Sequence, residues 1–250
     1  MDNLEECFKL ISAINFASFQ INIRIFLEIS YENKESNNII TENLIKQFIQ
    51  LGKIVIIDTL GTLKGNKYVA GKDFKLPLNN GSLSFMYEDC LNDATNDSKM
   101  LIKEIFQSLS EYSETVPFVP FETLKNIVDD MVDKTHEFWL LILKNKLAKF
   151  QKLGYFATSK EEASNLNNIL SSDCAIIDLS KLDSTFLNRY IKVIYSILET
   201  LKTKPQVLIG VSNLVDKKGL KSIITSDVPS TFITHSKFKY TGEIVSMFDN

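Results

Sequence analysis

Two aspartates follow continuous apolar runs of the kind that form buried strands. Asp58 ends the run 54–57, and Asp178 ends the run 174–177. Ligands of open α/β sheets bind in the crevice at the carboxyl ends of the strands, where a carboxylate can serve as a general base or a metal ligand. An aspartate in this position also caps the turn or helix that comes after it, and that is its commoner role. The sequence therefore favours two caps, with catalysis or metal binding as the alternative.

Further polar residues flank other predicted elements. Ser36 and Asn37 precede a predicted helix at 39–51, where they can bind an anion at the helix N-terminus or cap the helix. Ser212 and Asn213 follow the apolar run 206–211 and can hydrogen-bond a ligand at the same sheet edge. We expect the first pair to act as a plain cap and the second pair to contribute little binding.

Four lysines in the run KNKLAKFQK are candidates for contact with DNA: Lys144, Lys146, Lys149 and Lys152. Lysine binds a phosphate as a point charge, so such contacts weaken as salt rises. The whole chain has a formal net charge of −3, which gives no sign of a nucleic acid or an anionic membrane as partner. A solvated helix face is the commoner role of such a run.

Composition and cysteine spacing exclude several classes of protein. The 250 residues are 44% hydrophobic and 24% charged, which is typical of a globular protein and excludes disorder. Three separated cysteines (Cys7, Cys90 and Cys174) and two histidines provide neither a disulfide framework nor a zinc site. No apolar run reaches the roughly 18 residues of a membrane span, and the N-terminus is acidic. We expect a soluble cytoplasmic protein without metal or membrane contact.

The N-terminal part of the chain predicts a βαβ unit. A strand at 22–29, a loop at 30–38, a helix at 39–51 and the strand LGKIVIID at 51–58 follow one another. A right-handed crossover would set the two strands side by side or one strand apart. From residue 61 to 93, short apolar pieces broken by Pro77 and Asn79-Asn80-Gly81 predict hairpin-like strands or an edge excursion.

Helical pattern dominates about residues 97–170, interrupted at Pro117 and Pro120. Within it, Trp139 to Ile142 fit the core of the insertion better than a patch facing a partner. The sheet resumes with strands at 174–179, 206–211 and 231–234, an amphipathic helix after the first, and a short helix at 217–225. This alternation predicts an α/β fold with a mainly parallel sheet. No flexible linker divides the chain, so we expect one domain over 1–250 with a helical insertion at about 97–170.

The stretch SYENKESNNIITENLIKQFIQLGKIVIIDTLGTL, residues 30–63, resembles the beginning of the ATPase core of the HerA and FtsK group of DNA-pumping P-loop proteins. In that group a phosphate loop opens a helix, and a basic turn leads into a strand that ends in Asp, a short spacer and Gly. The run IRIFLEI takes the place of the first core strand, and IIDLSKLDSTFLNRYIKVIYSILETL resembles the Asp-Leu-Ser segment of the HerA branch. PQVLIGVSNLVD lies where that family has its Walker B strand, and VPSTFITHSKFKY where the next strand lies. Covering 22–63 and 174–239, the resemblance implies a RecA-like P-loop NTPase core with a mainly parallel sheet and helices on both faces.

The motifs that would bind and hydrolyse ATP depart from the family pattern. A Walker A loop needs glycines, a lysine and a Ser or Thr, yet residues 30–38 contain no glycine. Gapless placement puts Ser36 at the lysine position and Asn37 at the hydroxyl position, while Lys34 lies in the wrong part of the turn. A Walker B strand ends in acidic residues that hold Mg²⁺, and Ser212 and Asn213 stand there instead. The resemblance thus implies a vestigial nucleotide site of these residues: Ser30, Lys34, Ser36, Asn37, Asp58, Ser212 and Asn213.

Arginine, the residue best suited to act on a phosphoryl transition state, is nearly absent. Only Arg24 and Arg189 occur among 28 basic residues. We therefore expect a pseudo-ATPase without a cofactor, working by protein contacts or self-association as a structural or regulatory subunit of a DNA-processing or DNA-translocating assembly. Three alternatives stay open: nucleotide bound in a rearranged loop with Lys34 or a partner supplying the cation, a degenerate RecA- or KaiC-like paralogue acting as a DNA-repair accessory protein, or a DNA-binding module using the four lysines.

Overall fold

The computed structural model describes most of the chain between residues 26 and 235. The described residues are 26–31, 45–46, 49–50, 52–61, 63–92, 94–116, 118–135, 138–170, 172–201, 205–211, 228 and 230–235.

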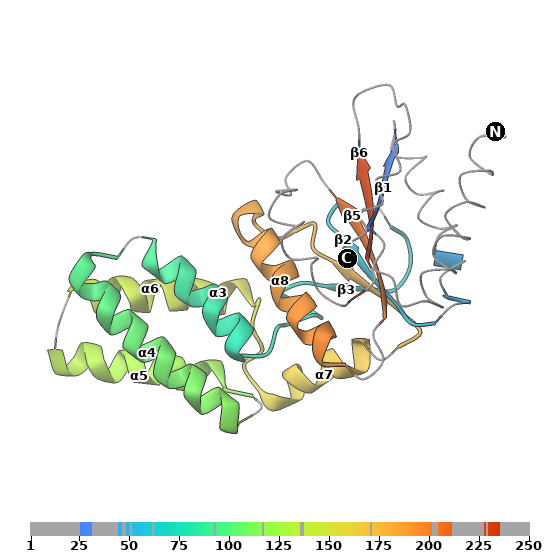
Figure 1. Ribbon diagram of the computed structural model, residues 1–250. Helices are drawn as coiled ribbons and strands as arrows, with labels where there is room; N and C mark the ends of the chain where they lie inside the picture. The colour runs from blue at the N-terminus through green and yellow to red at the C-terminus, as the bar shows by residue number, and fades with distance from the viewer. Residues whose placement is uncertain are drawn as a thin grey trace, which may run out of the picture. The chain divides into compact units, whose positions relative to one another are not determined.

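Six strands form one sheet in the order β1-β6-β5-β2-β4-β3 (Figure 1). Four neighbouring pairs are parallel: β1 with β6, β6 with β5, β5 with β2, and β2 with β4. The predicted α/β class with a mainly parallel sheet is confirmed. The bounds of the strands are β1 Phe26–Tyr31, β2 Ile54–Asp58, β3 Lys67–Val69, β4 Cys174–Asp178, β5 Gln206–Val211 and β6 Ser230–His235.

The middle strands are buried because their sequences are apolar without interruption. All of β2 is buried, as are Val207, Leu208 and Ile209 of β5. Parallel strands that are covered on both faces require such continuous runs. The register pairs Asp58 with Asp178 on one side and with Gly210 on the other, so the carboxyl ends of β2, β4 and β5 lie level at one edge.

The expected relation between the first two strands is wrong. Both β6 and β5 lie between β1 and β2, so these strands are neither adjacent nor one strand apart. Strands from the C-terminal part of the chain insert there, with Thr234 of β6 paired to Ser30 of β1 and to Val211 of β5. Strand β1 also runs through Ser30 and Tyr31, where the sequence predicted a loop.

The hairpin-like strands predicted between residues 61 and 93 are wrong for the second half of that segment. Among its described residues only β3 and two isolated bridges are extended, and a helix comes next at α3, Asn80–Leu91. Asn79 is its N-cap: the Asn79 side chain accepts from the Ser82 N–H, and the Ser82 hydroxyl accepts from the Asn79 N–H. This capping box starts a helix where the Asn-Asn-Gly run looked like a turn.

Helices occupy the segment in which the sequence predicted an insertion, and prolines lie at the break between two of them. Helix α4 ends at Thr115 and α5 begins at Phe121, on either side of Pro117 and Pro120. The chain divides into two compact units, unit 1 from residues 1–68, 170–188 and 197–250, and unit 2 from 69–169 and 189–196. The remaining helices are α4 Asn96–Thr115, α5 Phe121–Thr135, α6 Phe138–Leu153, α7 Lys160–Leu170 and α8 Ser184–Thr200.

The predicted amphipathic helix after β4 is α8, and its apolar positions are buried as expected. Asp183 caps it by accepting from the Thr185 N–H at 3.0 Å. In unit 2, Tyr190 donates its hydroxyl to the Phe74 carbonyl at 3.1 Å, and burial raises the pKa of Tyr190 well above its usual value. The buried apolar residues of α8 that the sequence predicted are Phe186, Leu187, Ile191, Ile194, Tyr195, Ile197 and Leu198.

Cys90 and Cys174 are free thiols in the part of the chain that the structure describes. Cys90 is 3% exposed. Its burial raises the pKa of the thiol to about 12, although the nearby Lys146 ammonium acts in the opposite direction. Cys90 is therefore an uncharged core group at neutral pH.

This burial predicts a specific loss of stability in alkali. The folded-state pKa of Cys90 lies above its ordinary value of 9.0, so the unfolded chain loses the proton first and the free energy of unfolding falls as pH rises past that value. When the pH rises from about 8 to about 10, we expect the free energy of unfolding to fall by about 1 kcal/mol less in the Cys90→Ala variant than in the wild type. Urea unfolding at each pH measures this difference. From pH 6 to 8 the gap between the two proteins should stay constant, and a constant gap through pH 10 would contradict the expectation.

Candidate functional site

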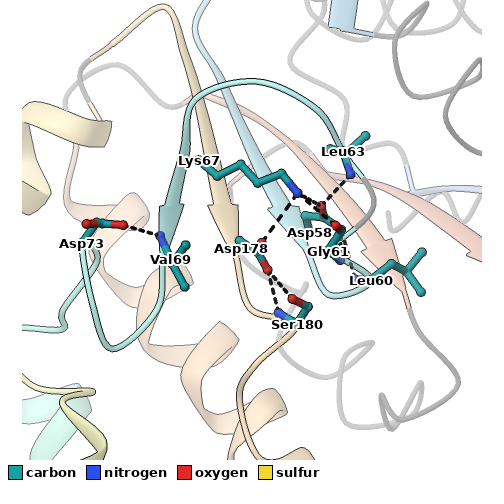
Figure 2. Close-up of polar contacts among 9 residues, drawn as sticks. All are labelled: Asp58, Leu60, Gly61, Leu63, Lys67, Val69, Asp73, Asp178 and Ser180. Carbon is teal, nitrogen blue, oxygen red and sulfur yellow. Dashed lines mark hydrogen bonds and ion pairs between the residues drawn. The ribbon is translucent and has the colours of Figure 1, made fainter.

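Asp58, at the carboxyl end of β2, organises the turn that comes after its strand. Its Oδ1 accepts from the Leu60 N–H at 3.0 Å and the Gly61 N–H at 2.8 Å (Figure 2). Its Oδ2 accepts from the Leu63 N–H at 3.1 Å. With a side chain only 2% exposed, Asp58 is a buried carboxylate held by backbone donors. Such donors are what an ionised carboxylate requires when it leaves water.

Asp178 has the corresponding place at the end of β4. Its Oδ1 accepts from the N–H of Ser180 at 2.9 Å and from the Ser180 hydroxyl at 2.6 Å. The two strand ends are joined directly, because the Leu179 N–H donates to the Asp58 carbonyl at 2.9 Å. The prediction that both aspartates cap the turns after their strands is confirmed.

Lys67, from β3, supplies the positive charge between the two carboxylates. Its Nζ lies 3.4 Å from Asp58 Oδ2 and 3.6 Å from Asp178 Oδ2 (Figure 2). It also donates to the carbonyl of Gly61 at 3.1 Å. The Lys67 side chain is 16% exposed, so the three charges form a largely buried cluster. The Lys67 ammonium thus lies between two negative side chains that would otherwise repel each other.

Gly61 permits the close approach of the two turns. Its φ of +69° lies in the left-handed region, which disfavours residues with a side chain. A Cβ placed there would lie 2.6 Å from Ser180 Oγ and 2.8 Å from Ser180 Cβ. Asp58, Gly61, Lys67, Asp178 and Ser180 are called the carboxyl-edge cluster below.

The polar atoms of the carboxyl-edge cluster are largely engaged with one another. Both oxygens of Asp58 accept hydrogen bonds, and Lys67 Nζ contacts three oxygens. A general base or a metal ligand needs a lone pair directed at substrate or metal. The geometry instead gives these residues a structural task, which is to close two turns and neutralise their charge.

The predicted nucleotide site is only partly within the described residues. Ser30 lies in β1 and Asp58 in β2, with β6 and β5 between their strands. Asp58 thus belongs to the carboxyl-edge cluster and is not brought to Ser30. The other members, Lys34, Ser36, Asn37, Ser212 and Asn213, lie outside the described residues.

The lysines predicted as DNA contacts lie on α6 but not on one narrow face. At about 100° per residue, Lys144, Lys152, Lys149 and Lys146 span about 200° of the helix surface. Lys144 Nζ lies 2.9 Å from Asp129 Oδ1, and Lys146 Nζ donates to the Asp89 carbonyl at 2.8 Å. These two lysines thus contact groups of unit 2 itself. Their contact with DNA stays a prediction.

The run Trp139–Ile142 divides between core and surface. Leu140 is 1% exposed and belongs to the core, as the sequence favoured. Leu141 and Ile142 are 42% and 36% exposed. Leu141 and Ile142 therefore fit the alternative interpretation of this run, a surface patch that faces a partner.

Sequence reasoning gave no site role to three members of the carboxyl-edge cluster, Gly61, Lys67 and Ser180, although Gly61 and Ser180 lie in the motif segments quoted above. For two of them a signal exists, because Gly61 follows Asp58 by three residues and Ser180 follows Asp178 by two. Asx turns use these short spacings. Lys67 has no comparable signal, since only the path of the connection into β3 brings it back to Asp58.

No protein-family model matches the chain, and no curated protein matches it. Over the residues the structure describes, no helix has both the length and the apolar character needed to cross a membrane. The same part of the chain contains no group of three or more His, Cys, Asp or Glu residues placed to share a metal ion. Motif chemistry and site geometry are therefore the basis for a functional proposal.

Proposed function

We propose that this chain is a catalytically inactive relative of the HerA and FtsK ATPases, with a RecA-like P-loop core. In this proposal it acts as a structural or regulatory subunit of a DNA-processing or DNA-translocating assembly. One observation carries the proposal. Thr234 of β6 pairs with Ser30 of β1 and with Val211 of β5, so the carboxyl ends of β1 and β5 lie nearly level at one edge of the sheet, and the sequence continues from these ends into the two motif segments.

Those two segments are the ones that would have to provide the phosphate loop and the acidic Mg²⁺ ligand. Ligands of parallel sheets bind at this edge, at the carboxyl ends of the strands. The first segment has Ser36 and Asn37 at the motif positions, and the second has Ser212 and Asn213. Neither pair supplies the lysine or the carboxylate that phosphate and Mg²⁺ require. The absence of both the phosphate-binding residues and the Mg²⁺ ligands supports a protein that has the fold of an ATPase but not its catalytic residues.

The arginines support the same reading. Arg189 lies in unit 2, where its Nε is 3.5 Å from Glu88 Oε2 and its guanidinium 3.7 Å from Asp89 Oδ1. An arginine finger must instead reach a transferring phosphoryl group. In the group that this chain resembles, ATP lies between neighbouring subunits. A subunit without the motifs keeps that interface for protein contacts, so its mechanism is scaffolding.

Isothermal titration with ATP and Mg²⁺ tests this function without knowledge of a partner. We expect no binding heat up to about 1 mM ATP, where a free energy of only about −4 kcal/mol would suffice for half occupancy. Micromolar binding, about −8 kcal/mol, would contradict the proposal. A Lys34→Ala variant is the matched comparison: binding that disappears with Lys34 would return the protein to the nucleotide-using enzymes.

A further inference from the structure

Helix α6 carries an exposed apolar stripe beside its buried face. Leu140, Leu143, Leu147 and Phe150 are buried, whereas Phe138, Leu141 and Ile142 are 76%, 42% and 36% exposed. At about 100° per residue, these three and the exposed Lys149 and Lys152 fall within an arc of about 100°. This set is called the α6 stripe. It is apolar in its first half and basic in its second.

An apolar pocket adjoins the first half of the stripe. It has a volume of about 140 Å³ and is lined by α3, α4, α6 and the α3–α4 turn. Phe138 and Ile142 belong to both the pocket and the stripe, so the two surfaces are continuous. An apolar cavity of about 150 Å³ admits a benzene-sized group. One aromatic or branched aliphatic side chain would therefore fill this pocket. Its lining includes Cys90, Thr95, Ile102, Phe138, Trp139 and Ile142.

Beside the pocket, the charge of Lys146 is opposed by that of Asp89 of α3, so the positive end of this surface is the second half of the stripe. Lys146 lines the pocket, and Lys149 and Lys152 lie in the second half of the stripe. The acidic residues of α5 contact a different part of α6: Asp129 pairs with Lys144, and Glu122 accepts from Gln151 at 3.0 Å. Lys144 and Gln151 lie about 100° or more around the helix from the centre of the stripe. The complementary partner surface is thus apolar at one end and acidic at the other.

We propose that the α6 stripe and its pocket bind an acidic amphipathic helix of a partner protein, with one large apolar side chain of that helix in the pocket. Helices bind grooves through apolar residues at positions i, i+3, i+4 and i+7, and acidic flanks would face Lys149 and Lys152. This proposal rests on the proposed function in one respect: that function expects contacts with a partner protein, and the α6 stripe is the surface of unit 2 that would make them. It does not depend on the nucleotide site.

A synthetic helical peptide tests the proposal, with Trp139 as the reporter. The chain has one tryptophan, and it lines the pocket, so an occupant should change its emission. The probe is a Trp-free peptide with Leu and Phe at i, i+3, i+4 and i+7 and Glu elsewhere. A second peptide carries Lys in place of Glu. We expect saturable binding of the Glu peptide and at least about tenfold weaker binding of the Lys peptide.

Three variants decide which surface is used. Phe138→Ser should weaken binding of the Glu peptide by about tenfold or more, whereas Met100→Ser, at a 66% exposed apolar residue of α4 outside the pocket, should not. Lys149→Glu with Lys152→Glu should reverse the preference in favour of the Lys peptide. No saturable change up to about 1 mM peptide, or equal affinity for both peptides, would overturn the proposal.

Self-association is the other occupant that the test must separate. Light scattering that shows dimers lost on Phe138→Ser would assign the stripe to a second copy of the chain and overturn the acidic-helix proposal. If neither the Glu peptide nor ATP binds, the proposed role of the α6 stripe is wrong and the proposed function still stands. If both ATP and the Glu peptide bind, the proposed function is wrong and the proposed role of the α6 stripe still stands.

Discussion

Lys67→Met should lower the free energy of unfolding by about 3–5 kcal/mol, because it leaves two buried carboxylates facing each other without a counter-charge. Lys67 Nζ lies 3.4 Å from Asp58 Oδ2 and 3.6 Å from Asp178 Oδ2. The substitution also removes the donor to the Gly61 carbonyl at 3.1 Å. Methionine keeps most of the apolar stem, so the loss reports on charge rather than packing. Urea unfolding followed by far-UV circular dichroism measures it.

Two further variants make the interpretation specific. Lys64→Met, at an exposed lysine of the same connection, should change stability by about 0.5 kcal/mol or less. Asp178→Asn combined with Lys67→Met should cost less than the sum of the single changes, because the repulsion between the carboxylates is gone. A loss below about 1 kcal/mol for Lys67→Met would show that solvent, and not Lys67, neutralises the carboxyl edge.

Gly61→Ala should lower the free energy of unfolding by about 2–4 kcal/mol, from backbone strain and overlap together. Its φ of +69° disfavours alanine, and the new Cβ would lie 2.6 Å from Ser180 Oγ. Relief of that overlap would move Ser180 from its two hydrogen bonds with Asp178. The same unfolding measurement gives the effect.

A second glycine and a rescue variant separate strain from overlap. Gly52 has a φ of +149°, which alanine also rarely adopts, but nothing lies within 4 Å of its Cβ position, so the loss for Gly52→Ala, about 1–3 kcal/mol, reports backbone strain without overlap. Ser180→Gly in the Gly61→Ala background should recover about 1 kcal/mol or more relative to additivity. Equal losses for the two alanine variants, with no recovery, would show that the contact between the two turns does not matter.

Much of the fold arises from local chemistry. The apolar runs that became β2, β4 and β5 could be recognised because strands covered on both faces exclude polar residues. The amphipathic spacing of α8 and the prolines between α4 and α5 likewise appear directly in the sequence. The segment Asn79-Asn80-Gly81 misled, because the same residue types start turns and cap helices. Ser82, which completes the capping box, decides between the two.

In the candidate site too, some features follow from the sequence and others only from the tertiary structure. The sequence by itself determined that Asp58 and Asp178 end buried strands and cap the turns after them, because cap chemistry involves residues only two to five positions away. Only the tertiary structure decided that β4 lies beside β2, that β5 and β6 separate β2 from β1, and that Lys67 returns between the two carboxylates. Strand order and charge pairing depend on contacts between distant segments, and no local pattern encodes which segments meet.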